Sequence, residues 1–239
     1  MKPLRIGLAG LGTVGIGVIR LLRENADMIT ARAGRPIEVV AITARDRTRD
    51  RGVDLSAMRW HDSATAVAQD PEIDVAVELI GGSEGPARDM VRTALERGLP
   101  VVTANKALVA LHGDRLSRLS SEKNAPLLFE AAVAGGIPAI KLVREGLAAD
   151  RLLSVGGILN GTCNYILTEM RATGRDFTDV LTEAQAKGYA EAEPSTDVDG
   201  WDTAHKLAIL AGLAFQPITF DTLSVQGIRD ITATDLKFA

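Results

Sequence analysis

The residues best suited to chemistry gather in one stretch, from Gly188 to Lys206. It holds several acids and ends at one lysine; the acids are Glu191, Glu193, Asp197, Asp199 and Asp202. Pro194 prevents a continuous helix through it. A lysine can supply a proton or a positive charge to a reacting oxygen, and acids can hold a cationic group. We therefore predict that this stretch forms the reacting end of a substrate pocket.

The end of the stretch belongs to a predicted helix that starts at Asp199 or Gly200 and runs to about Ala214. On it Asp199, Asp202 and Lys206 lie at i, i+3 and i+7, which is one face of a helix. An ordinary surface ion pair between Asp202 and Lys206, worth roughly 0.2–0.5 kcal/mol, is the alternative. Both interpretations remain open at this point.

A second chemical pattern lies near the start of the chain, where a short apolar strand, Leu4–Ala9, precedes Gly10-Leu11-Gly12-Thr13-Val14-Gly15. A helix is predicted to follow over about 14–31. In this context G-x-G-x-x-G is typical of dinucleotide binding. Gly10 permits the turn, Gly12 lets a pyrophosphate approach and Gly15 lets helix and strand pack closely. A glycine-rich turn without a ligand is the alternative.

The cofactor is expected to be selected after the next buried strand, Ile37–Thr43. There the chain reads Ala-Arg-Asp-Arg-Thr-Arg over 44–49. Arg45 favours NADP(H), because arginine accommodates a 2′-phosphate; Asp46 keeps NAD possible, because an acid binds the ribose hydroxyl. A solvated charged loop is the alternative.

Further strands are predicted at 74–80, 100–103 and 127–130, with helices at 62–68, 86–97 and 113–123. Lys106 follows the 100–103 strand at its carboxyl end, the edge of an open α/β sheet where ligands bind. We therefore expect Lys106 to meet a phosphate, a ribose or a substrate carboxylate, although a solvated lysine would have the same position.

Glu130 precedes a turn of small residues that runs to Pro138. A carboxylate beside backbone carbonyls suits a hard cation, and a domain hinge is the alternative. Beyond Leu147 a strand is predicted at 151–159, a helix from Asn160 to Thr173, and another at 177–187.

Composition narrows the class of protein. With 239 residues, 46% of them hydrophobic, the chain is long enough for one large or two intimate globular domains. A net charge of -4 argues against general nucleic-acid binding. Cys163 is the only cysteine, which excludes an internal disulfide. The start is not a signal peptide, and no apolar run is long enough to span a membrane, so we expect a cytoplasmic protein.

The chain resembles homoserine dehydrogenase over essentially its whole length. The matching motifs are Gly-Leu-Gly-Thr-Val-Gly at 10–15, Thr-Ala-Asn-Lys at 103–106, Glu-Ala-Ala-Val-Ala-Gly-Gly-Ile-Pro at 130–138 and Ile-Leu-Asn-Gly-Thr-Cys-Asn-Tyr-Ile-Leu at 158–167. The family signature appears as Ala184-x-x-x-Gly188-Tyr-Ala, then Pro194-x-x-Asp197-Val-x-Gly200-x-Asp202-x-x-x-Lys206. Glu193 departs from it, because the family generally has Asp, Asn or Ser before the proline.

The resemblance implies a Rossmann-like, doubly wound parallel α/β sheet over 1–134 that binds NAD(P). An α+β catalytic and dimerisation domain over 135–239 would follow, incomplete at its C-terminus. The implied reaction interconverts L-homoserine and L-aspartate 4-semialdehyde, within threonine and methionine biosynthesis. A homodimer without nucleic-acid or membrane partners is expected.

The resemblance also implies residue roles. Lys206 looks like the proton donor and acceptor. Glu191 and Asp202 look like binders of the substrate ammonium, with Asp197 nearby, and Lys106 looks like a residue at the junction of nicotinamide and substrate. Cofactor contacts are implied for Gly12, Thr13, Val14, Arg45 and Gly188. A structural sodium ion is implied in the Glu130 region, at Val133, Gly135 and Ile137.

Two other functions remain as alternatives. A phosphorylating semialdehyde dehydrogenase needs a nucleophilic cysteine, for which Cys163 is the only candidate. A nucleotide-binding sensor domain would bind the cofactor without turnover.

Overall fold

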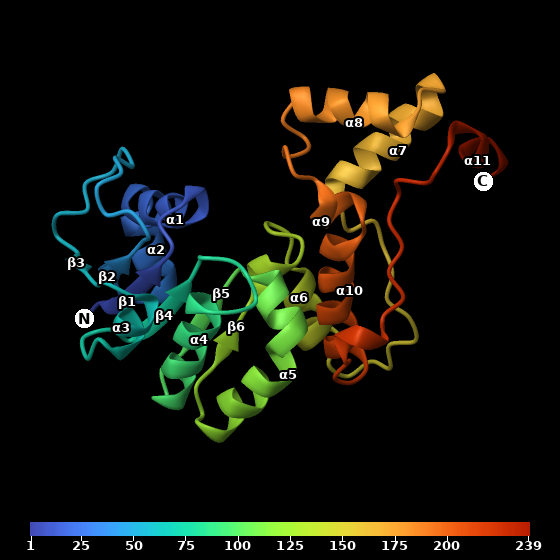
Figure 1. The fold of residues 1–239 in the computed structure, drawn as a ribbon. Helices are drawn as coiled ribbons and strands as arrows, with labels where there is room; N and C mark the ends of the chain where they lie inside the picture. Colours follow the sequence, from blue (N-terminus) through green and yellow to red (C-terminus); the bar gives the residue numbers. More distant parts are fainter. The chain divides into compact units, whose positions relative to one another are not determined.

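The computed structural model describes residues 1–239, which divide into two compact units, Met1–Leu142 and Val143–Ala239. Each unit is described by itself (Figure 1). The sequence places the domain boundary at 134/135, whereas the two compact units of the structure meet between Leu142 and Val143. No helix of the chain is long and apolar enough to cross a lipid bilayer.

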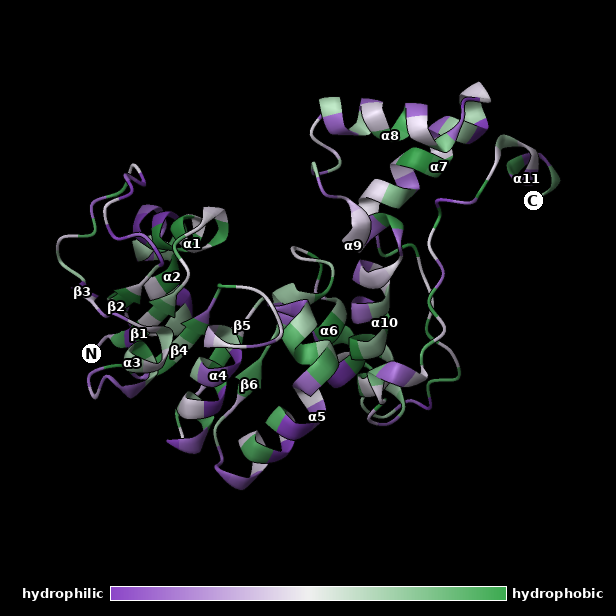
Figure 2. Ribbon diagram, viewed as in Figure 1, coloured by the Kyte–Doolittle hydropathy of each residue, from purple (hydrophilic) through white to green (hydrophobic).

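The first unit is built on a six-stranded parallel sheet of order β3-β2-β1-β4-β5-β6. Its strands are β1 Leu4–Ala9, β2 Ile37–Thr43, β3 Arg59–Trp60, β4 Val75–Glu78, β5 Val101–Thr103 and β6 Leu127–Leu128. The strands are mostly hydrophobic (Figure 2), as expected for a sheet with both faces covered. The predicted α/β parallel sheet is thus confirmed, and β1 and β2 have the predicted bounds. The two-residue strand β3 carries too short a pattern to be predicted.

Helices connect these strands: α1 Thr13–Glu24, α2 Ala26–Ala33, α3 Ala64–Gln69, α4 Pro86–Glu96, α5 Lys106–Glu122, a 3₁₀ turn at Glu130–Ala132 and α6 Ala139–Lys141, followed by a π-helical turn at Leu142–Gly146. The helix predicted over 14–31 is two helices that meet at Asn25. The helix predicted at 113–123 begins at Lys106, because the Asn105 side chain accepts a hydrogen bond from Leu108 N and caps the first turn.

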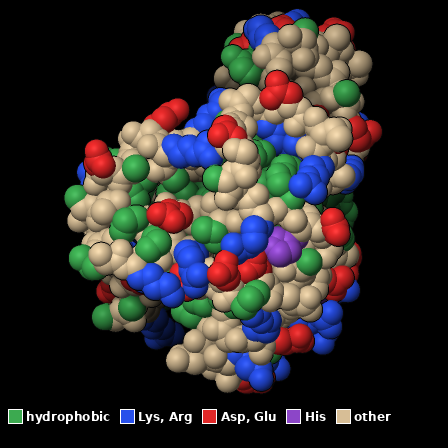
Figure 3. Space-filling view, turned by 90° about the vertical axis from the view of Figure 1, so that its left-hand side faces the viewer, with side chains coloured by type: hydrophobic (Ala, Val, Ile, Leu, Met, Phe, Trp, Pro, Cys, Tyr) green, Lys and Arg blue, Asp and Glu red, His purple; other side chains and the backbone are tan.

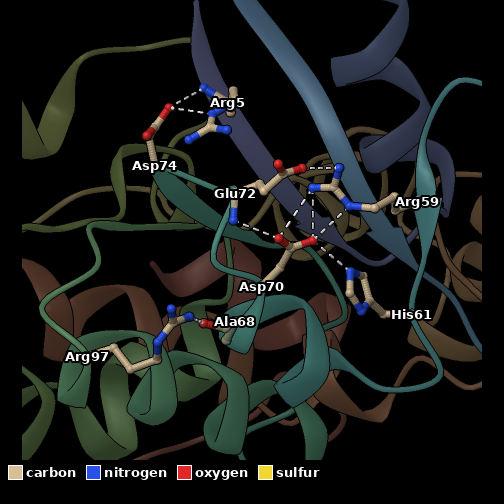
Figure 4. Close-up of polar contacts among 8 residues, drawn as sticks. All are labelled: Arg5, Arg59, His61, Ala68, Asp70, Glu72, Asp74 and Arg97. Carbon is tan, nitrogen blue, oxygen red and sulfur yellow. Dashed lines mark hydrogen bonds and ion pairs between the residues drawn. The ribbon is translucent and has the colours of Figure 1, made fainter.

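A buried acid, Asp70, secures the end of α3 to the sheet (Figure 4). Its carboxylate accepts hydrogen bonds from the Arg59 guanidinium, from His61 Nε2 at 2.9 Å and from Glu72 N at 2.8 Å. Burial by itself raises the pKa of Asp70, but these donors outweigh it and lower the pKa below its usual value.

The second unit contains only helices and irregular segments. The helices are α7 Gly161–Thr173, α8 Phe177–Ala186, α9 Ser195–Val198, α10 Trp201–Ala214, a 3₁₀ turn at Phe220–Thr222 and α11 Ala233–Phe238. A buried cluster that includes Ile166, Met170 and Val180 packs α7 against α8. Asn160 caps α7 as predicted, with its side chain accepting from Cys163 N at 2.7 Å.

The strand predicted at 151–159 is wrong, because this segment has no regular secondary structure. A strand forms only where a neighbouring strand pairs with its backbone N–H and C=O groups, and this unit has no other strand. The segment keeps its apolar side chains in solvent: Leu153 is 83% and Ile158 81% exposed.

Candidate functional site

The three glycines of the first loop differ in whether the fold itself requires a glycine at that position. Gly10 has φ +99° and lies so close to the end of β4 that an added Cβ would be 2.3 Å from Leu79 O. A Cβ on Gly15 would lie 1.9 Å from Gly10 O. Both glycines are therefore required by the packing of the protein itself. A Cβ on Gly12 would meet nothing within 4 Å, and its φ of -81° suits any residue, so packing gives no reason for a glycine there.

The open space beside Gly12 lies at the N-terminus of α1. No side chain caps this terminus and its first turn holds no acid, while Thr13 and Val14 are exposed. The unpaired N–H groups and partial positive charge of such a terminus suit a phosphate. The loop therefore fits the pyrophosphate of a dinucleotide, as the motif predicted.

The loop after β2 uses its acid internally. Asp46 Oδ1 accepts hydrogen bonds from Thr48 Oγ1 and Thr48 N, both at 2.8 Å, and from Arg49 N at 3.2 Å. The side-chain hydrogen bond from Thr48 is the largest of several causes that lower the pKa of Asp46. The carboxylate that would bind the ribose of NAD is thus committed to a turn, while Arg45 is exposed.

Arg51, which follows that turn, joins the loop to its surroundings. Its Nε donates to Leu11 O in the glycine loop at 3.2 Å, and its Nη1 donates to Arg49 O at 2.7 Å. Its guanidinium also lies 5.6 Å from the centroid of the Trp60 ring, and that of Arg47 lies 5.5 Å from the same centroid. Sequence reasoning missed Arg51 and Trp60, because contacts between separate loops leave no local pattern.

At the carboxyl edge of the sheet, Lys106 is the first residue of α5 and is half-buried. The preceding Asn105 donates from Nδ2 to Gly82 O at 2.6 Å, which ties the helix start to the loop after β4. Glu78, at the end of β4, is fully buried and accepts from Thr103 Oγ1 at 2.6 Å. The sequence shows Glu78 only as an acid inside an apolar strand, a pattern that predicts no functional role.

The second unit has an open cavity of about 580 Å³ around the predicted lysine. It is lined by Asn160, Gly161, Thr162, Tyr165, Tyr189, Asp197, Asp202 and Lys206. Three of the predicted chemical residues thus meet there, from α9 and α10. Asn160, Thr162 and the two tyrosines were not predicted as site residues.

One hydrogen-bond network orders the polar wall of this cavity. Lys206 Nζ donates to Asp202 Oδ2 and to Leu159 O, both at 2.7 Å. Asn160 Nδ2 donates to Asp202 Oδ2 at 2.8 Å and to Asp197 Oδ1 at 2.7 Å. Asp202 is 4% exposed and Lys206 is partly buried, so their pair is not the exposed surface ion pair considered as the alternative.

The remaining acids of the 188–206 stretch lie elsewhere. Glu191 is exposed and does not line the cavity. Asp199 follows α9 and pairs with Arg229, so it does not share a helix face with Lys206. The Glu193 carboxylate accepts a hydrogen bond from Ser195 N at 3.1 Å, which fixes the start of α9. Glu193 does so although its side chain is one methylene longer than the aspartate common in the family. Gly188 has φ +74°, a conformation that favours glycine.

Cys163 does not have the environment of a nucleophile. Its thiol donates to Asp197 O at 3.2 Å. Burial, followed by the charges of Asp197 and Asp202, raises the pKa of this thiol to about 11. A reactive cysteine needs a lowered pKa, so this geometry gives no support to a cysteine-dependent semialdehyde dehydrogenase.

Glu130 caps the short helix α6. Its Oε1 accepts from Ile140 N at 3.1 Å and its Oε2 from Lys141 N at 2.9 Å. No group of three or more His, Cys, Asp or Glu side chains able to hold a metal is present. A cation here would therefore depend on backbone carbonyls of the following turn, in which Ala134 has φ +51°.

On the face shown in Figure 3, basic side chains lie among acidic and hydrophobic ones and form no continuous basic surface. This distribution agrees with the net charge of -4.

The parallel sheet and the glycine loop at the start of α1 define an NAD(P)-binding domain. Family models agree: one described as "Homoserine dehydrogenase, NAD binding domain" matches residues 10–130, and one described as "Homoserine dehydrogenase" matches residues 138–239. The chain belongs to the homoserine dehydrogenase family.

Individual relatives cover the whole chain. A homoserine dehydrogenase of Pseudomonas aeruginosa is 52% identical over 240 residues, which are 100% of this chain and 55% of that protein. The crystal structure of a homoserine dehydrogenase from Thiobacillus denitrificans is 48% identical, with a TM-score of 0.93 over 100% of this chain and 55% of that one. A hyperthermophilic archaeal homoserine dehydrogenase mutant is 26% identical, with a TM-score of 0.84 over 99% of this chain and 76% of that one. The chain thus spans about half the length of the first two relatives.

Proposed function

We propose that this chain carries the cofactor and substrate sites of an NAD(P)-dependent oxidoreductase that interconverts L-homoserine and L-aspartate 4-semialdehyde. The observation that carries the proposal is the partly buried network on the wall of an open cavity, formed by Lys206, Asp202, Asn160 and Asp197. Such a network holds a lysine and two carboxylates in fixed positions, which a substrate with a reacting oxygen and an ammonium group requires.

Lys206 is proposed to be the proton donor and acceptor. An ammonium has three N–H donors, and Asp202 and Leu159 O account for two of them. The third is left for the substrate oxygen, where it transfers a proton or stabilises negative charge as hydride reaches or leaves the carbon. When bound, the nicotinamide cofactor would supply that hydride to the semialdehyde or accept it from homoserine.

The carboxylates are proposed to hold the substrate ammonium. Asp197 lines the cavity, where Asn160 Nδ2 donates to its Oδ1 at 2.7 Å and the Thr162 hydroxyl, shared with Tyr189 O, lies 3.2 Å from its Oδ2. Asp202 lines it too, although its position beneath Lys206 also makes it the orienting partner of that lysine. Glu191 is proposed as a further acid, contributed by the exposed loop after α8.

NADP(H) is the proposed cofactor, with NAD(H) as the weaker alternative. Asp46 accepts hydrogen bonds within its own turn, whereas Arg45, two residues after β2, is exposed. The archaeal relative was solved in complex with NADPH. Gly10, Gly12, Thr13, Val14 and Gly15 are proposed to receive the pyrophosphate, with Lys106 and Gly188 at the nicotinamide end.

A structural sodium ion is proposed at Glu130, with the backbone carbonyls of Val133, Gly135 and Ile137. Glu130 fits this role, because each carboxylate oxygen receives one backbone N–H and keeps lone-pair capacity for a cation. A homodimer formed through the second unit is also proposed. The exposed apolar side chains of the unpaired 151–159 segment support it, since large exposed apolar surfaces mark interaction sites.

A steady-state assay with homoserine and either NADP or NAD tests the function. Lys206→Met keeps the aliphatic stem of the lysine and removes its charge, and we expect it to lower kcat by a factor of about 10²–10⁴ with little change in NADPH affinity. Lys237→Met, at an exposed lysine of α11, is the matched control and should behave as the unaltered protein. Near-normal turnover by Lys206→Met would overturn the assignment of the proton donor. Absence of turnover in the unaltered chain would overturn the proposed activity.

A further inference from the structure

One buried acid of the first unit has no role in the function proposed above. Glu78 ends β4 with 0% of its surface exposed. A buried carboxylate is costly unless donors surround it, and this one accepts three hydrogen bonds. Ile80 N donates to Oε1 at 2.7 Å, Gly81 N donates to the same oxygen at 3.0 Å, and Thr103 Oγ1 donates to Oε2 at 2.6 Å.

The direction of the bond to Thr103 is determined by its other partner. Asn105 N donates a hydrogen bond to Thr103 Oγ1 at 2.9 Å. The hydroxyl therefore accepts from Asn105 and donates its own hydrogen bond to Glu78. Asn105 then caps α5 at Leu108 N and donates to Gly82 O at 2.6 Å. Hydrogen bonds through one hydroxyl thus link Glu78 to Asn105, the residue immediately before Lys106.

The backbone that follows Glu78 also lies next to the glycine loop. Leu79, the residue after Glu78, donates from its backbone N to Ala9 O at 2.8 Å. Gly10 lies so near Leu79 O that a side chain on it would clash. The Glu78 carboxylate therefore fixes two backbone segments at the carboxyl edge of the sheet, the turn after β4 and, through Thr103, the segment after β5, and the turn after β4 adjoins the glycine loop.

We propose that Glu78 is a positioning residue for the cofactor edge of the sheet, acting through Thr103 and Asn105 on the placement of Lys106. This inference rests on the proposed function, since it needs Lys106 to work at the junction of nicotinamide and substrate. Glu78 touches neither reacting group; it orders the backbone that presents Lys106 and the Gly81–Gly82 turn to the cofactor.

Two substitutions interrupt this hydrogen-bonded link at different points. Glu78→Gln keeps the shape but has only one acceptor oxygen, so its NH₂ must face either the Thr103 hydroxyl or the two backbone N–H groups. Thr103→Val keeps the volume and removes the hydroxyl. Thr103→Ser is the matched control, because it retains the hydroxyl and loses only a methyl group.

The test measures three quantities for the full chain and each variant: the dissociation constant of NADPH by fluorescence titration, kcat and KM for homoserine, and the thermal midpoint. Displacement of a group that positions reacting partners costs rate steeply, so Glu78→Gln and Thr103→Val should each lower kcat at least about tenfold and weaken NADPH binding. Thr103→Ser should keep both kcat and NADPH affinity close to those of the unaltered protein. The double variant should be no worse in kcat than the poorer single variant, because both interrupt the same hydrogen-bonded link.

A purely structural cap predicts a different result. It would lower the thermal midpoint while kcat and NADPH affinity of the folded protein stay unchanged, and that outcome overturns the proposal. Additive losses in the double variant would also overturn it. If Glu78→Gln does not fold, the comparison of Thr103→Val with Thr103→Ser decides alone. If the unaltered chain binds NADPH but does not oxidise homoserine, the proposed activity fails, and the NADPH affinities of the variants still judge the role of Glu78.

Discussion

Substitution of Gly12 by alanine separates binding from folding more cleanly than any other change in the glycine loop. A Cβ at this position meets nothing within 4 Å, and φ of -81° is ordinary for alanine. Replacing glycine reduces the entropy of the unfolded chain and stabilises by about 0.4–1 kcal/mol. Alanine is a poorer N-cap than glycine, which costs a similar few tenths to about 1 kcal/mol. These terms nearly cancel, so the free energy of unfolding should change by less than about 1 kcal/mol.

NADPH affinity should respond very differently. The new methyl group would occupy the space beside the N-terminus of α1 in which the pyrophosphate approaches the backbone. A loss of about 1.4 kcal/mol is already a tenfold weaker complex, and we expect at least that loss. Fluorescence titration with NADPH and urea unfolding, followed by circular dichroism, measure the two quantities on the same preparation.

Two neighbouring glycines supply the controls. Gly17 lies inside α1 with open space around it, so Gly17→Ala should stabilise by roughly 0.5–1 kcal/mol and leave NADPH binding unchanged. Gly15→Ala would place a methyl group 1.9 Å from Gly10 O and should destabilise by about 1–3 kcal/mol or more. Unaltered NADPH affinity in Gly12→Ala would refute the reasoning, because the open space would then have no ligand. Unfolding of that variant would refute the packing argument.

Three further outcomes are expected. Arg45→Ala should weaken NADP(H) more than NAD(H), while Arg35→Ala, an exposed arginine before β2, changes neither affinity; equal losses for both cofactors would remove the 2′-phosphate argument. Iodoacetamide should alkylate Cys163 slowly at neutral pH, with a rate that rises as the pH approaches the thiol pKa of about 11. Mass spectrometry measures the labelling, and rapid labelling at neutral pH would contradict this prediction. The lowered pKa of Asp70 contributes stability that is present above its unfolded pKa and is lost as pH falls through its folded pKa. Asp70→Asn should therefore lower the stability at neutral pH and flatten the loss of stability below about pH 4; acid-unfolding curves that coincide would contradict it.

The sequence predicted those features that local patterns encode. The strands β1 and β2, the cap of α7 at Asn160 and the placement of Gly10 beside a strand and a helix are all properties of short segments. The start of α5 was missed although Asn105 is a good cap, because the capping contact also depends on Gly82 and Thr103 from other loops. The strand predicted at 151–159 does not form, because its sequence pattern suits a strand but the second unit holds no other strand to pair with it.

Within the candidate site, residue types were predictable and their partners were not. The sequence shows acids around one lysine, but not which acid reaches it. Asp199 belongs to the same acidic stretch as Lys206, yet it pairs with Arg229 on a distant segment. Asp46 likewise looks able to bind a ribose until the hydrogen bonds from Thr48 are known.

The acidic stretch is best explained by three separate tasks. Glu193 and Asp199 hold the backbone around α9, through Ser195 and Arg229 respectively. Asp202 orients Lys206 from beneath. Asp197 turns both of its oxygens to donors on the cavity wall.

The amide of Asn160 connects these tasks, and its orientation is unambiguous. Its Oδ1 accepts from Cys163 N at the start of α7, so its Nδ2 must face the two carboxylates, to which it donates at 2.7 and 2.8 Å. Two like charges brought this close repel each other. Lys206 offsets the charge of Asp202, whereas Asn160 gives Asp197 a neutral donor. An ammonium group entering the cavity would complete the compensation. The arrangement fits the proposed site for an amino acid with a reacting oxygen: Lys206 would serve the oxygen, and the substrate ammonium would balance the charge of Asp197.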